Sequence, residues 1–131
     1  MSERIAFVLG GGGLRGAVQI GMLRALFERG IAPDLVVGTS IGAINGAIVA
    51  QTPNLAAVDD LLDAWMSPEA SSVYGDALAN QFVRLIRTKT HLNSPAPIRR
   101  MLERILGADA TFQSLAVPLR VVAASIERAA E

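Results

Sequence analysis

Residues 34–51 read DLVVGTSIGAINGAIVAQ. This stretch decides the fold because its pattern changes from that of a strand to that of a helix across two residues, Thr39 and Ser40. Residues 34–38 form a short apolar run that is typical of a buried strand. Residues 41–51 favour a helix full of small side chains, which lowers helix propensity and permits a close approach to a sheet. A buried strand that runs directly into a buried helix is the building unit of α/β proteins.

An earlier segment repeats this unit. Residues 4–9 (RIAFVL) predict a second buried strand, and residues 10–16 (GGGGLRG) predict a loop. Residues 17–29 then favour a helix that ends at Gly30, with Pro33 beyond it. The apolar positions of this helix that recur at helical spacing are Val18, Met22, Ala25 and Leu26.

The rest of the chain predicts more helix and one more strand. Helices are expected at residues 55–66, 76–87 and 97–106, with a loop at 88–96 and a strand at 119–125. In the first of these helices the inward stripe is expected to be Leu55, Val58, Leu62 and Trp65, with Asp59, Asp60 and Asp63 mostly outward. Four apolar side chains on helical stripes are expected to line the core or a lipid pocket: Trp65, Met66, Phe82 and Met101. The order of elements predicts an α/β fold with a mainly parallel sheet.

Composition narrows the class of protein. The chain has 131 residues, 51% of them hydrophobic, and a mean hydropathy of +0.39, which fits one folded domain. Its formal net charge is 0, which argues against nucleic acid as a partner. With no cysteine and the single histidine His91, neither a disulfide nor the usual zinc site is expected. No signal peptide or membrane span is recognisable, so a soluble protein is expected.

Gly38-Thr39-Ser40-Ile41-Gly42 forms G-x-S-x-G at the junction between the predicted strand and helix. This is the context of a nucleophile elbow, in which the flanking Gly38 and Gly42 permit a sharp turn that exposes the serine hydroxyl. The new helix also directs its first N–H groups towards charge that develops near Ser40. The alternative interpretation is a glycine-rich turn that only packs a helix on a strand.

The loop at residues 10–16 can bind an anion through unhindered backbone N–H groups, either a phosphate or the oxyanion of an acyl-transfer intermediate. Gly11, Gly13 and Gly16 satisfy G-x-G-x-x-G, and Asp34 follows, as in dinucleotide-binding proteins. Asp34, however, stands at the start of its predicted strand. The dinucleotide-binding fold has its acidic residue at the carboxyl end of that strand. No Lys-Ser or Lys-Thr follows the loop, so a Walker A site is excluded.

Together, GGGGLRGA (residues 10–17) and GTSIGA (residues 38–43) resemble the signature of the patatin-like phospholipases, G-G-G-x-[RK]-G followed by G-x-S-x-G. The segments SPAPIRRML (94–102) and TFQSLAVPLRVVAAS (111–125) are also similar to bacterial members. The resemblance implies a three-layer α/β/α fold and a serine lipid acyl hydrolase, of the phospholipase A or esterase type, that uses a Ser-Asp dyad and no cofactor. It implies that Ser40 is the nucleophile. The residues that it assigns to the oxyanion loop are Gly11, Gly12, Gly13, Leu14 and Arg15.

The family's aspartate belongs to a D-G-[GA] motif, and no Asp-Gly pair occurs in this sequence. We therefore expect residues 1–131 to be the amino-terminal portion of the domain, truncated at its carboxyl end and inactive alone. A competing interpretation is a triad with His91 as base and an acid from Asp59, Asp60, Asp63 or Asp76. A rival class is a non-catalytic module whose glycine loop binds nucleotide or phosphate.

The resemblance also implies a lipid or acyl-ester substrate, and we expect a cytoplasmic protein with peripheral contact to a membrane surface. Arg15 either anchors the glycine loop through salt bridges or approaches a substrate phosphate. The arginines of the 97–106 helix are expected to form a solvated face: Arg99, Arg100 and Arg104.

Overall fold

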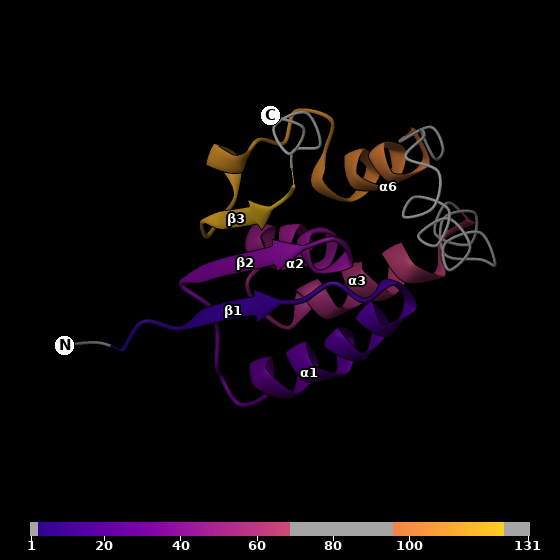
Figure 1. Ribbon diagram of the computed structural model, residues 1–131. Helices are drawn as coiled ribbons and strands as arrows, with labels where there is room; N and C mark the ends of the chain where they lie inside the picture. Colours follow the sequence, from indigo (N-terminus) through magenta and orange to yellow (C-terminus); the bar gives the residue numbers. More distant parts are fainter. Residues whose placement is uncertain (1–2, 69–95, 125–131) are drawn as a thin grey trace.

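The computed structural model describes residues 3–68 and 96–124. Within them, β1 (Ala6–Leu9), β2 (Leu35–Thr39) and β3 (Leu119–Val122) form one parallel sheet in the order β1-β2-β3 (Figure 1). The register pairs Leu9 with Gly38 and Thr39 with Val122, so the carboxyl ends of all three strands lie at one edge. The predicted α/β class and parallel sheet are confirmed.

The described helices are α1 (Ala17–Phe27), α2 (Ile41–Gln51), α3 (Ala56–Met66) and α6 (Ala96–Leu106), with short 3₁₀ helices at Gly13–Gly16 and Phe112–Ser114. They match four of the predicted helices. The helix predicted at 76–87 and nearly all of the loop predicted at 88–96 lie outside the described residues. Gly30 follows α1 in the left-handed conformation, with φ of 71° and its N–H donating to Phe27 O at 2.9 Å, as expected of a helix C-terminus.

Helix α2 packs directly on the sheet. Seven of its eleven residues are buried, among them Ile48 and Val49 at 1% and 0% exposure. A Cβ at Gly46 would stand 3.0 Å from Val36 Cγ1, which shows how closely the helix backbone approaches the strand. The prediction of a buried, small-residue helix is confirmed, and α2 organises the core.

The inward face expected for α3 was right at Val58, which is 3% exposed, and wrong at the two leucines. Leu55 and Leu62 are 47% and 43% exposed, whereas Leu61 is fully buried together with Ala57. The buried face of α3 includes two alanines, Ala57 and Ala64. Their small side chains let neighbouring elements pack closely against the helix, and this close packing stabilises the fold more than burial of Leu55 and Leu62 would. Met66 was also expected in the core and is 81% exposed, while Met101 is 1% exposed, as predicted. Phe82 lies outside the described residues.

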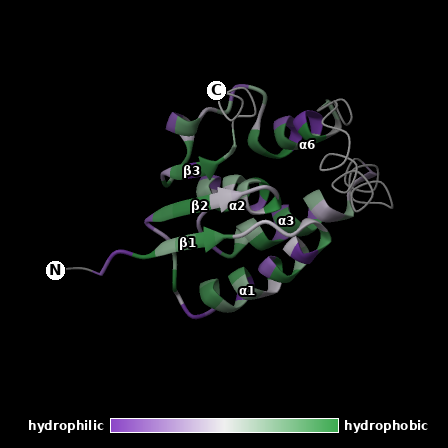
Figure 2. Ribbon diagram, viewed as in Figure 1, coloured by the Kyte–Doolittle hydropathy of each residue, from purple (hydrophilic) through white to green (hydrophobic). Residues whose placement is uncertain are grey.

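On α1 the recurring apolar positions did not identify the buried side either. Val18 and Met22 are 66% and 61% exposed, and the core instead receives Ile20, Leu23 and Phe27. Because α1 has apolar residues on several sides, as the green colouring in Figure 2 shows, periodicity alone does not select one face.

The face of the sheet opposite α2 carries exposed valines in the described part of the chain, beside Thr39 and Arg120. Val8 on β1 and Val122 on β3 are 73% and 62% exposed, while Phe7 and Leu9, on the α2 side of β1, are buried. All described strands are parallel, and parallel sheets are normally covered on both faces. None of the described helices is long and apolar enough to cross a membrane.

Candidate active site

Ser40 alone connects β2 to α2. Its backbone has φ of 52° and ψ of −128°, and it is the one non-glycine residue with positive φ in the described ranges. Such a conformation is costly for a residue with a Cβ and is found where the surrounding structure enforces it. Ser40 is exposed and its side chain makes no capping hydrogen bond, although serine at a helix N-terminus normally caps. The Ser40 backbone is therefore strained, and the hydroxyl has no hydrogen-bond partner among the described side chains.

The glycines on either side of Ser40 are required by packing. A Cβ at Gly42 would lie 2.1 Å from Leu9 O and 2.6 Å from Gly10 O. A Cβ at Gly38 would lie 2.4 Å from Gly42 O. These are backbone atoms, which cannot move aside as the end of a side chain can. The spacing of G-x-S-x-G thus lets the first turn of α2 rest against the ends of β1 and β2.

The glycine loop lies against the Ser40 turn. It leaves β1 at Gly10 and passes through positive φ at Gly12 (155°) and Gly13 (58°) before the 3₁₀ turn. A Cβ at Gly11 would stand 3.2 Å from Ser40 Cβ. The two motifs follow paired strands, which brings them together at the carboxyl edge of the sheet.

Four successive amides of this loop are unengaged. The N–H groups of residues 11–14 donate to no acceptor within residues 3–68 and 96–124. The next amide differs, since Arg15 N donates to Gly12 O at 3.2 Å and closes the turn. The loop therefore presents up to four backbone donors beside the Ser40 turn.

A buried amide network behind the loop was not anticipated. Asn45 on α2 is 0% exposed; its Nδ2 donates to Gly16 O at 3.1 Å and to Gln19 Oε1 at 2.8 Å. Gln19 Nε2 donates to Gly10 O at 2.8 Å, and Trp65 Nε1 donates to Asn45 Oδ1 at 3.0 Å. The sequence signal was a lone asparagine in the apolar helix INGAIVA, because a buried polar side chain needs specific partners.

Asp34, the acid of the dinucleotide alternative, has a structural partner at the other end of the sheet. Its Oδ2 accepts from Ile5 N at 2.8 Å, and its own N–H donates to Ile5 O at 2.7 Å. These bonds join the start of β1 to the start of β2. The carboxylate is therefore remote from the glycine loop at the strand ends.

No described side chain forms a hydrogen bond with Ser40 Oγ. Asp60 and Asp63 line a groove between α3 and α6, together with Arg104, and Ser40 is not among the residues that line it. Asp59 is exposed in the first turn of α3, and Asp109 is exposed after α6. His91 and Asp76 lie outside the described residues.

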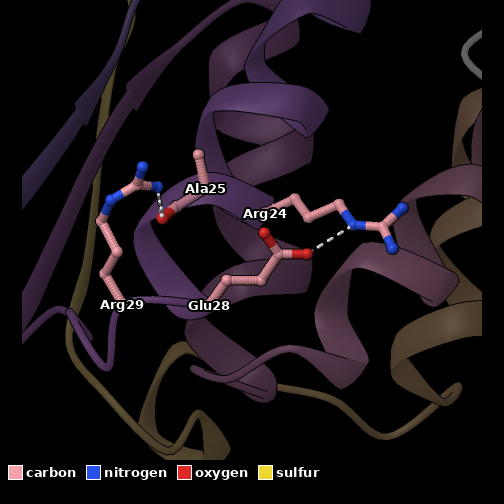
Figure 3. A network of polar contacts seen from close by, with 4 residues as sticks. All are labelled: Arg24, Ala25, Glu28 and Arg29. Atoms are coloured by element: carbon pink, nitrogen blue, oxygen red, sulfur yellow. Dashed lines mark hydrogen bonds and ion pairs between the residues drawn. The ribbon is translucent and has the colours of Figure 1, made fainter.

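The described arginines differ in whether they have a partner. At the end of α1, Arg24 Nε donates to Glu28 Oε1 at 2.9 Å and Arg29 donates to Ala25 O at 2.8 Å (Figure 3). On α6, the hydrogen bond and charge of Glu103 raise the pKa of Arg99. Arg15, at the glycine loop, is exposed and has no ion pair within the described ranges. The salt-bridge anchor considered for Arg15 is thus not formed with any described residue.

Comparison with known proteins gives the family. The sequence model of the family described as patatin-like phospholipase matches residues 7–129. Patatin-like phospholipase domain-containing protein ZK370.4 of Caenorhabditis elegans is 48% identical over 67 residues, which cover 51% of this chain and 5% of that protein. Patatin-like phospholipase domain-containing protein 7 of Rattus norvegicus is 46% identical over 69 residues, or 53% of this chain and 5% of that protein.

Neuropathy target esterase sws of Drosophila melanogaster is 49% identical over 61 residues, which cover 47% of this chain and 4% of that protein. The chain thus spans about a twentieth of the length of these relatives. The family match covers nearly the whole of the chain, and it agrees with the parallel α/β fold. This protein belongs to the patatin-like phospholipase family.

Proposed function

We propose that Ser40 is the nucleophile of a lipid acyl hydrolase of the phospholipase A or esterase type. The observation that carries this proposal is the Ser40 turn: a strained, exposed serine whose hydroxyl neither caps α2 nor bonds to a described side chain. Strain of this kind concentrates at functional sites. Family membership makes the protein a hydrolase in general terms, with lipids as the substrate class.

In the proposed reaction, Ser40 Oγ attacks the ester carbonyl carbon while its proton passes to a base. The carbonyl oxygen becomes an oxyanion, which the amides of Gly11, Gly12, Gly13 and Leu14 are placed to stabilise. Collapse of the intermediate expels the alcohol, which takes up the proton, and leaves an acyl-serine. Water then hydrolyses that ester, which releases the fatty acid and restores the hydroxyl.

The four unengaged amides define the oxyanion site in this proposal. The amide of Arg15, which the resemblance also assigned to it, donates to Gly12 O and so helps to hold the loop in shape. Backbone donors fixed before the reaction need little reorganisation as charge develops, which is why such sites lower barriers effectively. The first turn of α2, which begins directly after Ser40, adds its positive end at the same place.

The base of the dyad is proposed to come from a D-G-[GA] aspartate that the 131-residue sequence does not contain. Asp34 is engaged at the opposite end of the sheet, and Asp60 and Asp63 face a groove that Ser40 does not line. A serine hydroxyl without a base within hydrogen-bond reach is a weak nucleophile. The chain alone is therefore proposed to be inactive, and contact with a lipid surface is proposed for the enzyme that carries it.

Covalent labelling tests the proposal. The chain extended by a downstream D-G-[GA] segment of the family is incubated with a fluorophosphonate, and the adduct is located by mass spectrometry of peptides. We expect one adduct, on Ser40, which is lost in Ser40→Ala. The matched control is Ser114→Ala, because Ser114 is an exposed serine whose hydroxyl donates to Thr111 O at 2.9 Å.

Two results would contradict the assignment. One is an adduct that survives Ser40→Ala. The other is the absence of labelling together with a rise in melting temperature on adding nucleotide or inorganic phosphate, which would favour the anion-binding alternative for the glycine loop.

A further inference from the structure

The glycine loop has few backbone bonds to hold it in place. Residues 11–14 donate no hydrogen bond to any described acceptor, and Arg15 N to Gly12 O is the bond that closes the turn within the loop. Both ends of the loop are held instead by side chains. Gly10 O accepts from Gln19, and Gly16 O accepts from Asn45. The position of the loop therefore depends on these two amide groups.

Gln19 and Asn45 act as one unit, because Asn45 Nδ2 also donates to Gln19 Oε1 at 2.8 Å. Both Nδ2 hydrogens of Asn45 are then engaged, and Trp65 Nε1 donates to Oδ1 at 3.0 Å. Only this orientation of the Asn45 amide satisfies the network, since the flipped amide would place Oδ1 against two other acceptor oxygens. Burial removes water as an alternative partner, which makes the arrangement specific.

The same unit connects the loop to the nucleophile turn. Asn45 lies on α2, five residues after Ser40, so the bond from Asn45 to Gly16 O ties the loop to the helix that Ser40 begins. A Cβ at Gly11 would already be 3.2 Å from Ser40 Cβ, so a small shift of the loop changes the distance from its amides to Ser40 Oγ. Oxyanion stabilisation depends steeply on that geometry.

We propose that Gln19 and Asn45 are positioning residues, which hold the ends of the glycine loop so that its amides face the oxyanion formed at Ser40. This inference rests on the proposed function for its catalytic consequence. The physical link itself, from Gln19 and Asn45 to the loop, is independent of any reaction and can be measured without one.

The test uses Gln19→Met, which keeps the length of the side chain and removes the hydrogen bonds to Gly10 O and Asn45. Gln19 is only partly buried, so the variant is expected to fold, and thermal unfolding checks this. The matched control is Gln51→Met, because Gln51 Nε2 also donates to a backbone carbonyl, Leu106 O at 3.0 Å, at the opposite end of α2. Trp65→Phe is a second variant, which removes the indole N–H from Asn45 Oδ1.

Two readouts separate the possible outcomes. Hydrogen exchange at the Arg15 amide, whose bond to Gly12 O closes the turn of the loop, is expected to quicken about tenfold in Gln19→Met and to stay unchanged in Gln51→Met. In the extended enzyme, kcat for a p-nitrophenyl ester is expected to fall at least tenfold in Gln19→Met, with KM within twofold, because alignment in the transition state is lost while ground-state binding remains. Trp65→Phe is expected to shift both readouts in the same direction by a smaller factor.

Failure of this inference and failure of the proposed function look different. Equal exchange in Gln19→Met and the original chain, or an equal change in Gln51→Met, would show that the network does not hold the loop. Faster exchange with unchanged kcat would refute the positioning role. If the extended enzyme shows no hydrolysis that depends on Ser40, the proposed function fails, while the exchange experiment still decides whether the network fixes the loop.

Discussion

Gly11 and Ser40 come so close that a Cβ on Gly11 would stand 3.2 Å from Ser40 Cβ, although the two residues belong to different loops. Each loop follows its own strand, and the pairing of Leu9 with Gly38 sets them side by side. The proposed oxyanion donors and the proposed nucleophile are thus aligned by the sheet register.

Replacing Gly42 by alanine should destabilise the fold by about 3 kcal/mol or more, because the new Cβ would lie 2.1 Å from the backbone oxygen of Leu9. The matched control is Gly21→Ala on α1, where nothing lies within 4 Å and the glycine is exposed. That variant should gain about 0.5–1 kcal/mol through helix propensity. Urea unfolding measures both, and equal stability of the two variants would refute the packing argument.

The strain at Ser40 predicts an order of stability for two substitutions at the proposed nucleophile. Ser40→Gly should be more stable than Ser40→Ala by about 1 kcal/mol, because glycine accepts a φ of 52° without a clash and alanine does not. Both variants should lose fluorophosphonate labelling. Thermal unfolding of the pair gives the answer, and an alanine variant as stable as the glycine variant would mean that the turn is relaxed.

The proposal that the base lies in a downstream D-G-[GA] segment predicts a large difference in activity between two lengths of the protein. The 131-residue chain, which has no Asp-Gly pair, should hydrolyse a short-chain p-nitrophenyl ester several orders of magnitude more slowly than the version extended by a D-G-[GA] segment. Each form is assayed with its Ser40→Ala variant. Hydrolysis by the short form that depends on Ser40 would instead point to His91 or one of the chain's own aspartates, which His91→Ala would then resolve.

Arg15 is exposed beside the glycine loop without an ion pair among the described residues, which favours its approach to a substrate phosphate over a structural anchor. Arg15→Gln should raise KM for a phospholipid about tenfold, because the variant loses one charged hydrogen bond to the phosphate. KM for a neutral p-nitrophenyl ester should stay unchanged. Arg120→Gln is the control, because Arg120 is exposed on β3. A similar change for both substrates would argue for an effect on the loop.

The strands, most helices and the neighbourhood of the two motifs were predictable because they depend on local patterns. Apolar runs mark the strands. Gly30 marks the end of α1, where the chain adopts a left-handed conformation that favours glycine. The inward faces of α1 and α3 were not predictable in this way. Leu62 and Met66 fit an apolar stripe as well as Leu61 does, and only the packing of small residues such as Ala57 decided which side is buried.

The candidate site shows the same division. The motifs placed Ser40 and the glycine loop at one sheet edge, since both follow paired strands. The partners of Asn45 could not be predicted, because Gly16 O and Trp65 Nε1 come from segments 29 and 20 residues away in sequence. Nothing in the spacing of those residues marks them as a set.

Trp65 is the only tryptophan in the sequence, and its place in the amide network makes it an optical reporter of the loop. Its indole N–H donates to Asn45, and its Cζ2 would be 3.1 Å from a Cβ at Gly16, where the loop ends. Tryptophan fluorescence, excited selectively over the single tyrosine of the chain, therefore has one source, in contact with the glycine loop. A shift in its emission wavelength or lifetime on adding an acyl-ester analogue would follow the glycine loop in solution without any attached label.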